Sequence, residues 1–385
     1  MAAAHAPSCR PAGSGLFGGR QPAPPPRPAG RRGIARPGPR NPPGDRLVIT
    51  RRWTWLVTGG GVLALAAVSA LALALGSAPL SLGDVVRALL GGGSSELAAT
   101  VVLGLRLPRI LLAALAGAGL AVAGVAFQAL TRNPLADPAV LGVASGAALG
   151  AVLGQIVGLE GSLLATFGLS AVAFAGALAA ATAVYLIASV SGRLPIQTLL
   201  LAGVIIGLFF SAVITLIISL VDFARLGGIL HWLMGSLGAL GYRPVVVMGV
   251  GCAVGVGAIY TQARALNLLA LGEESALQMG VDAERVKRVI FVAASLLTGV
   301  VVAHTGPIGF VGLIVPHAVR LAIGSDNRLL IPGAGAAGAS FLVLADTLAR
   351  LVVQPAELPV GVITAFCGAP FFIYLLRTRF RRGLP

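Results

Sequence analysis

Three arginines have the spacing expected of a carboxylate-binding surface. Arg106 and Arg109 flank Leu107-Pro108 at the head of a long apolar segment, and Arg350 follows Asp346 by four residues near the end of another. A guanidinium binds both oxygens of a carboxylate through its planar fork, so these side chains suit partners that carry aspartate or glutamate. The four-residue spacing predicts that Asp346 pairs with Arg350 within one helix. We therefore expect Arg106 and Arg109 to matter more to an external partner than Arg350 does.

Other reactive side chains exclude several kinds of enzyme. The only lysine, Lys287, does not belong to a Gly-x-x-x-x-Gly-Lys-Ser/Thr sequence, so the chain lacks a P-loop and is not itself an ATPase. No HExxH motif or nucleophile elbow occurs, and the four histidines and three cysteines are scattered without metal spacing. We predict no catalytic residue, no metal site and no cofactor.

The composition identifies the class of protein. The chain is 57% hydrophobic and only 11% charged, whereas soluble domains carry roughly 25% charged residues. Its 53 glycines favour closely packed helices, because small residues let helix backbones approach within the lipid phase. Alternating strands of the kind found in membrane barrels are absent from the sequence. The predicted fold is an all-α polytopic membrane protein.

Apolar segments of spanning length recur along the chain. A helix needs about 20 apolar residues to cross the hydrocarbon core. We predict ten transmembrane helices, at residues 55–75, 109–131, 138–158, 163–190, 195–220, 244–262, 286–304, 308–323, 329–351 and 359–377. The spans 138–158 and 308–323 are short or rich in glycine.

Charges at the ends of these segments predict the topology. With both termini in the cytoplasm, twelve basic residues outside the N-terminal region fall inside and six fall outside, in agreement with the positive-inside rule. Arg106, Arg109 and Arg350 are among the six exceptions. Basic residues that break the sorting rule suggest a binding surface on the outer face.

The first 46 residues differ from the rest. They contain eight arginines, eleven prolines and a single acid, Asp45. Such a segment cannot bury enough apolar surface to fold, so residues 1–46 are interpreted as a disordered basic cytoplasmic tail and residues 47–385 as the membrane domain. An incorrectly assigned start codon, or an arm that binds lipid or nucleic acid, remain alternatives.

A polar loop at residues 264–285 carries unexpected apolar side chains. Its central part predicts two short amphipathic helices, with Gly272 opening the first and Gly280 separating them. Leu271, Leu277, Met279 and Val281 would expose apolar surface in a free loop. The pattern favours a helix that lies in the groove of a cytoplasmic partner, and a plain solvated loop is the alternative.

Carriers that use ion gradients keep carboxylates or histidines deep in the membrane. Here Asp346 and Asp222 fall near the outer ends of their segments, and Glu357 lies in the loop beyond. The driving force is therefore expected from another subunit, with an autonomous secondary carrier or channel as the alternative.

One apolar segment contains hydroxyls at helical spacing. Ser211, Thr215 and Ser219 recur every four residues within 195–220. Either they bond back to carbonyls of their own helix or they form a weakly polar stripe that lines a pore.

Ordered sequence strings across residues ~55–380 resemble the FecCD permease family of ABC importers for iron chelates, haem and cobalamin. The strings are Arg106-Leu107-Pro108-Arg109, residues 128–138 with 141–143, 200–204, 232–236, 271–273 with 280–281, 306–313 with Pro316-His317 and Arg320, and 357–362 with 368–370.

The resemblance implies a multi-pass permease subunit of the bacterial cell membrane. It implies two permease subunits, as a homodimer or heterodimer, two cytoplasmic ABC ATPases, an extracytoplasmic substrate-binding protein and surrounding membrane lipid, with no nucleic acid. A ferric siderophore is the first choice of substrate, and cobalamin or haem are alternatives.

The resemblance also implies roles for individual residues. It implies that the binding protein docks at Arg106, Arg109 and Arg350. It implies that the ATPase is coupled through Leu271, Gly272, Glu273, Leu277 and Gly280. It implies that the inner gate is formed by Asn133, Leu135, Ile196 and Gln197. Ile196 and Gln197 replace small hydroxyl residues of the cobalamin permease. Leu135 has the size of an apolar plug, and an apolar constriction can close a path by excluding water.

Overall fold

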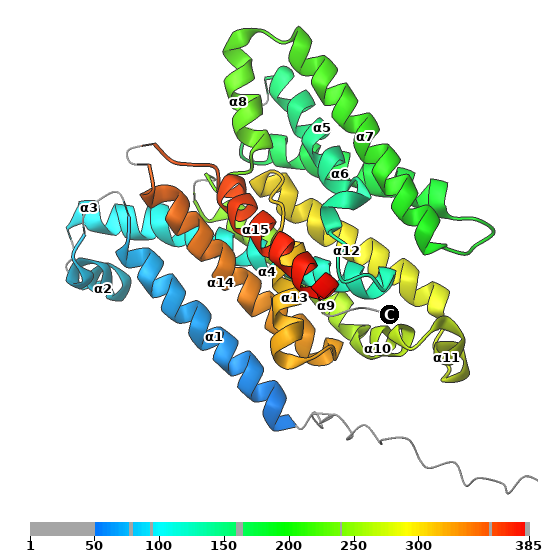
Figure 1. The fold of residues 1–385 in the computed structure, drawn as a ribbon. Coiled ribbons are helices and arrows are strands. Elements are labelled where there is room, and N and C mark those ends of the chain that lie inside the picture. Colours follow the sequence, from blue (N-terminus) through cyan, green and yellow to red (C-terminus); the bar gives the residue numbers. More distant parts are fainter. Residues whose placement is uncertain are drawn as a thin grey trace, which may run out of the picture. The chain divides into compact units, whose positions relative to one another are not determined.

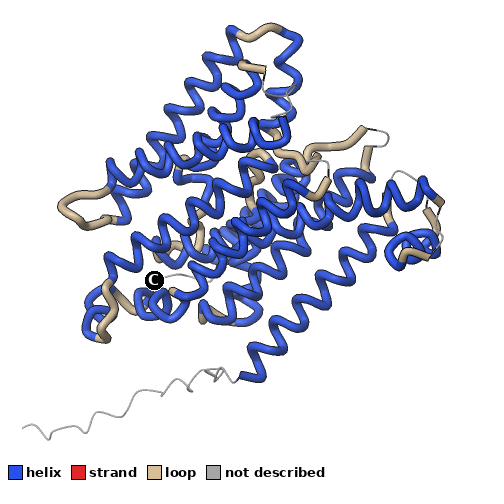
Figure 2. The backbone as a smooth tube through the Cα atoms, turned by 180° about the vertical axis from the view of Figure 1, so that it is seen from behind, coloured by secondary structure: helices blue, strands red, loops and turns tan. Residues whose placement is uncertain are grey.

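The computed structural model describes residues 51–76, 80–92, 95–158, 165–238, 241–353 and 356–381. The predicted basic tail, residues 1–46, lies outside the described residues. Within the described ranges the regular secondary structure is helical, and no strand is present (Figure 2).

Seven helical runs among the described residues have the length and hydropathy to cross a membrane, and three shorter apolar helices complete the set. The ten membrane helices are α1 Arg51–Ala74, α4 Leu107–Thr131, α5 Val143–Ile156, α6 Ala165–Ala188, α7 Ile196–Leu220, α9 Arg243–Thr261, α12 Ala283–Thr305, α13 Val311–Ile323, α14 Asn327–Leu351 and α15 Val360–Arg381 (Figure 1). Each predicted span therefore corresponds to a helix, and the fold class is confirmed. The cytoplasmic location of the termini stays a prediction.

Several short helices were not predicted from the sequence. They are α2 Leu82–Leu90, α3 Glu96–Ala99, the π-helix η1 Thr100–Arg106, the 3-10 helix η2 Pro138–Leu141, α8 Phe223–Leu233 and α10 Ala263–Ala270, whereas α11 Glu273–Gln278 lies where the first short helix after Gly272 was predicted. Most are too short to show a clear hydrophobic period. Local capping explains α2, because Ser81 and Asp84 form a capping box at its start.

The helix that carries Arg106 and Arg109 begins earlier than predicted. α3, η1 and α4 form one run of 36 residues, Glu96–Thr131, instead of a helix that starts near residue 109. The π-helical turn lies immediately before Pro108, which is in the first turn of α4. A π-turn changes the hydrogen-bond register, so the missing N–H of the proline is tolerated there.

Three helices form the buried centre of the membrane domain. The most apolar windows of α4, α12 and α14 have 78%, 72% and 67% of their residues buried, compared with 11% for α1 and 17% for α7. α4 lies between α14, α12, α9 and α13 and contacts all four. α4, α12 and α14 are therefore the core around which the other membrane helices pack.

Glycines allow α4 and α14 to touch along their backbones. A Cβ atom on Gly117 would come within 2.1 Å of the carbonyl oxygen of Gly338, and one on Gly338 would come within 2.4 Å of the carbonyl oxygen of Gly117. Only glycine permits this approach, which is the usual way that membrane helices gain contact area. The close contact fixes the register between α4 and α14, and with it the neighbours of Arg109.

Candidate functional site

The 264–285 segment contains α10 and α11, but no separate short helix follows Gly280 as was predicted. Gly272 precedes α11 with φ of 122°, and Gly280 follows it with φ of 80°. Both angles are in the region that favours glycine. The residues of the second predicted helix form the first turn of α12 instead. Asp282 caps the start of α12, where its side chain accepts a hydrogen bond from the Arg285 amide. Gly272 and Gly280 thus bound α11, as expected, but Gly280 separates it from a membrane helix.

Three of the four apolar side chains predicted to be exposed around α11 point outward, whereas Val281 is partly buried against the core. Leu271, Leu277 and Met279 are 69%, 60% and 49% exposed. Single exposed leucines are common, but three within nine residues beside charged groups form a small apolar surface. This surface has the composition expected of a partner-binding helix.

Glu273, in the first turn of α11, binds two basic residues on membrane helices. Its Oε1 accepts from Nη2 of Arg132 at 2.9 Å, and its Oε2 accepts from Nζ of Lys287 at 2.9 Å. Arg132 follows the last turn of α4 in a left-handed conformation, φ 51°. α11 is therefore bound to the ends of both α4 and α12.

The same lysine continues the network toward a second loop. Nζ of Lys287 also donates to Oε1 of Glu284 at 2.9 Å, and the other oxygen of Glu284 accepts from the Leu194 amide at 2.7 Å. Lys287 is only 6% exposed at its side chain, so both ion pairs are shielded from water on one side. Leu194 begins the predicted gate loop that leads into α7.

The four predicted gate residues lie next to the two ends of this network. Asn133 directly follows Arg132, and its side-chain oxygen accepts from the Leu135 amide at 3.0 Å, which forms a tight Asx turn. Ile196 and Gln197 are the first residues of α7, two positions after Leu194. The joint action of the two pairs of gate residues stays a prediction.

Asp137, two residues after Leu135, is half-buried. Burial raises the pKa of the Asp137 carboxyl, while hydrogen bonds from the backbone amides of Ala139 and Phe310 act in the opposite direction. Asp137 caps η2 through the Ala139 amide at 2.8 Å. The carboxyl therefore links this turn to Phe310, the residue that starts α13.

The sequence contained one signal for the network. Glu284 and Lys287 are three residues apart, a spacing that places them on one helix face. Neither residue was chosen as a site, and their link to Glu273 and Leu194 depends on the packing of α10, α11 and α12.

A second charged cluster lies at the other end of α4. Nε and Nη2 of Arg109 donate to Asp346 on α14 at 2.9 to 3.1 Å, and Nη1 donates to Oε2 of Glu357 at 2.7 Å. Nε of Arg350 also donates to Asp346, at 3.2 Å. The Asp346–Arg350 pair was predicted and is confirmed.

Arg350 is not the only arginine bound to Asp346. Arg109 makes the two-nitrogen contact to this carboxylate, and it leaves only 18% of its side chain exposed. The sequence could not show this pair because Arg109 and Asp346 are 237 residues apart. Of these groups, Glu357 is the one that is well exposed, at 51%.

The Arg106 side chain is also buried and does not present its charge to solvent. It is 5% exposed, and its Nη1 donates to the carbonyl oxygen of Leu73 at 2.7 Å. Leu73 belongs to the last turn of α1, where unpaired carbonyl oxygens favour a cation. A Cβ atom on Gly76 would come within 2.5 Å of the same guanidinium, so the glycine provides the space for it.

The hydroxyls of α7 bond within their own helix. Ser211 donates to the carbonyl oxygen of Gly207, Thr215 to that of Ser211 and Ser219 to that of Leu216, at 2.7 to 2.9 Å. All three side chains are nevertheless on exposed positions. A pore-lining role stays a prediction. In that role these hydroxyls could accept hydrogen bonds from a ligand, because each already donates its proton to a carbonyl of its own helix.

Known proteins resemble this chain over most of its length. Residues 64–378 match the FecCD transport family. The cobalamin import system permease protein BtuC of Halobacterium salinarum is 43% identical over 297 residues, 76% of this chain and 77% of that protein. The hemin transport system permease protein HmuU of Yersinia pestis is 40% identical over 318 residues, 81% of this chain and 94% of that protein. A solved structure described as an inward-facing conformation of a metal-chelate type ABC transporter aligns with a TM-score of 0.73 and 30% identity, over 84% of this chain and 99% of that chain.

Proposed function

The chain belongs to the FecCD transport family and is a multi-pass membrane permease subunit of an ABC importer, and we propose that it passes a metal chelate into the cytoplasm. A substrate-binding protein delivers the chelate from outside, and ATPase subunits bound at α11 drive its passage. Two permease subunits, identical or paralogous, together enclose the path.

One observation carries this mechanism. Glu273 on α11 binds Arg132, which precedes the Asn133 turn, and Lys287, which reaches the Leu194 amide through Glu284. A displacement of α11 by an ATPase therefore acts on the Asn133 turn through one ion pair, and on the loop before α7 through two ion pairs and the hydrogen bond from the Leu194 amide. The two Lys287 pairs are partly removed from water and resist separation more strongly than exposed pairs, whereas the Arg132–Glu273 pair leaves 44% and 38% of its side chains exposed and is the weaker connection.

The arrangement of acids supports an external energy source. Among the described residues of the membrane helices, Asp346 is the buried carboxylate, and it is bound to both Arg109 and Arg350. Both ion-pair partners of this carboxylate belong to the chain itself, so its oxygens are already occupied by Arg109 and Arg350 instead of facing a transported cation. This favours ATP-driven transport over the alternative of an autonomous ion-coupled carrier.

A ferric siderophore is our first proposed substrate. Cobalamin and haem are the alternatives, which the names of the BtuC and HmuU relatives favour. The exposed face of α7 is apolar apart from hydroxyls that bond internally, and such a wall binds bulky ligands weakly. Selectivity would then come from the binding protein.

Docking of the binding protein is proposed at the cluster around Arg109. Glu357 is half-exposed and occupies one nitrogen of this guanidinium, so a carboxylate on the arriving protein would take its place. Arg350 would stabilise the cluster through Asp346, and Arg106 would support the surface by holding the end of α1.

Reconstitution tests the proposal. The permease would be placed in proteoliposomes with an ABC ATPase and a binding protein encoded beside it, and uptake of a ferric siderophore, cobalamin and haem would be compared with and without ATP. We expect ATP-dependent uptake of one chelate that requires all components. Uptake driven by a proton or sodium gradient without the ATPase would support the secondary-carrier alternative.

A further inference from the structure

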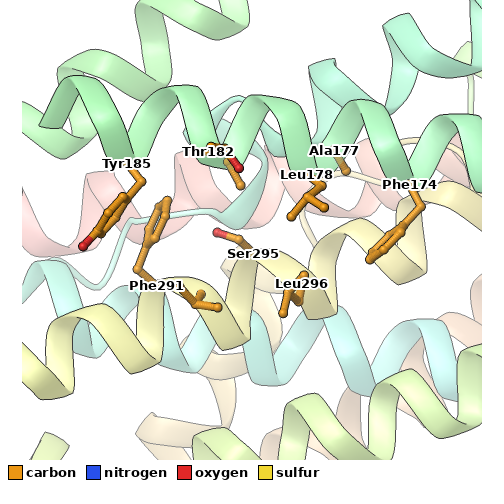
Figure 3. Close-up of a pocket in the computed structure, with 10 residues that line it drawn as sticks. Phe174, Ala177, Leu178, Thr182, Tyr185, Phe291, Ser295 and Leu296 are labelled. Atoms are coloured by element: carbon orange, nitrogen blue, oxygen red, sulfur yellow. The ribbon is translucent and has the colours of Figure 1, made fainter. Parts of the chain in front are cut away.

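Two apolar grooves run along the two sides of α12. The first lies between α6 and α12, has a volume of about 200 Å³ and is lined by residues that include Phe174, Leu178, Tyr185 and Phe291. Figure 3 shows these side chains facing each other across the gap between the two helices. The Tyr185 and Phe291 rings stack at one end, with centroids 6.1 Å apart.

The second groove lies between α9 and α12 and is larger. Its volume is about 600 Å³, and its walls include Val254, Ala258, Val289 and Val300. Both grooves share Phe174, Val292 and Leu296 as lining residues. They are therefore neighbouring channels, separated by a low ridge on α12.

This surface faces outward from the domain. The most apolar windows of α6 and α9 are 33% and 28% buried, and Val254, Val292 and Leu178 are 68%, 48% and 47% exposed. In a chain that spans a bilayer, exposed apolar grooves at membrane depth are filled by hydrocarbon chains.

One end of the grooves is basic. Arg288 lines the second groove, is exposed and lies one helical turn before Phe291 and Val292. Its Nε donates to the backbone carbonyl of Glu284 at 3.3 Å, and Arg288 forms no ion pair within the part of the chain that the structure describes. No side-chain acceptor is seen for its remaining guanidinium nitrogens among the described residues.

Further positive charge surrounds this end. Arg285 is exposed on the preceding turn of α12, and exposed Arg193 is adjacent to Leu194, whose amide binds Glu284. The nearby acid, Glu284, is already used by Lys287 and the Leu194 amide. Net positive charge therefore remains where the grooves meet the membrane surface.

We propose that this surface binds one anionic phospholipid with two acyl chains, which straddles α12. Its headgroup phosphate binds Arg288, one acyl chain lies in the α6–α12 groove and the other lies in the α9–α12 groove. The two grooves lie side by side on α12, so the two acyl chains of one phospholipid, which are joined at the headgroup, can occupy one groove each. Basic residues at the ends of transmembrane grooves are a recurring means of binding anionic headgroups.

Native mass spectrometry tests the site in purified protein. Detergent-solubilised permease would be titrated with dioleoyl phosphatidylglycerol, dioleoyl phosphatidylcholine or oleate. We expect one tightly bound phosphatidylglycerol per chain, with weaker binding of the other two. Arg288→Gln should weaken phosphatidylglycerol binding about fivefold, the factor that one basic residue near an anionic surface typically supplies.

Two further variants make the result specific. Val292→Trp fills both grooves from an exposed position, so it should reduce binding while the melting temperature stays near that of the parent protein. Arg377→Gln removes an exposed arginine on α15, away from the grooves, and should leave binding unchanged. Equal affinity for phosphatidylglycerol and phosphatidylcholine, equal binding of oleate, or an identical loss in Arg288→Gln and Arg377→Gln would each overturn the proposal.

Discussion

Nζ of Lys287 lies 2.9 Å from Oε2 of Glu273 and joins the short helix α11 to the buried membrane helix α12. Lys287 is the only lysine of the chain. Its second partner, Glu284, contacts the loop that enters α7. The relationship gives the coupling proposal a specific physical link, and it can be broken one residue at a time.

Removal of the Glu273 charge should uncouple transport from ATP hydrolysis. We expect Glu273→Gln to lower chelate uptake about tenfold, because a hydrogen bond to a charged group contributes about 1.5–3 kcal/mol. ATP hydrolysis by the assembled complex should persist. Uptake and hydrolysis would be measured on the same proteoliposomes.

The adjacent acid provides the control for this experiment. Glu274 is exposed and forms no ion pair within the described part of the chain, so Glu274→Gln should leave the ratio of uptake to hydrolysis unchanged. An equal ratio in both variants would contradict the coupling role of Glu273.

Changes on the apolar face of α11 should weaken ATPase binding itself. Leu277→Glu places a charge on a side chain that is 60% exposed, and Gly280→Pro removes a residue with φ of 80° that proline cannot adopt. We expect less ATPase to co-purify with either variant. Leu90→Glu, at an 80% exposed leucine of α2, is the matched control. Normal ATPase recovery and transport with both α11 changes present would remove this role.

Neutralisation of Asp346 should destabilise the protein. Its carboxylate is 1% exposed and binds Arg109 and Arg350, so Asp346→Asn leaves two arginines without their shared partner. Loss of one member of a buried ion pair costs about 3–5 kcal/mol. The free energy of unfolding in detergent should fall by that order, whereas Asp222→Asn, at an exposed residue before α8, should change it little. Equal stability of the two variants would show that the cluster does not support the fold.

Glu357 should compete with the binding protein for Arg109. We expect Glu357→Gln to speed association of the substrate-loaded binding protein and Arg109→Glu to slow it, with both effects shrinking as salt rises. Association rates on immobilised permease would be measured at low and high ionic strength. Unchanged rates for both variants at low salt would show that docking occurs elsewhere.

A substitution of Arg106 should distinguish a structural role of this side chain from a role in docking the binding protein. Because its guanidinium binds the Leu73 carbonyl, Arg106→Glu should lower the melting temperature. The association rate of the properly folded fraction should change less than in Arg109→Glu. A large docking defect at unchanged stability would restore the interpretation of Arg106 as a direct contact.

Helices and local pairs were predictable from the sequence. The ten membrane helices follow from apolar runs, and hydropathy is a property of neighbouring residues. The Asp346–Arg350 pair follows from four-residue spacing, and the limits of α11 follow from Gly272 and Gly280, whose positive φ angles end regular helix. These features depend on contacts within a few residues.

Contacts between distant segments were decided by the tertiary structure. Arg109 meets Asp346 because Gly117 and Gly338 bring α4 and α14 together, and Glu273 meets Arg132 across 141 residues of chain. Ion-pair partners depend on the register and rotation of the packed helices. The apolar residues are distributed almost uniformly around each helix, so the sequence pattern does not specify that register or rotation. The sequence alone therefore determined a ten-helix permease and the segments that carry its charges, whereas helix packing decided which arginines are buried and which acids they bind.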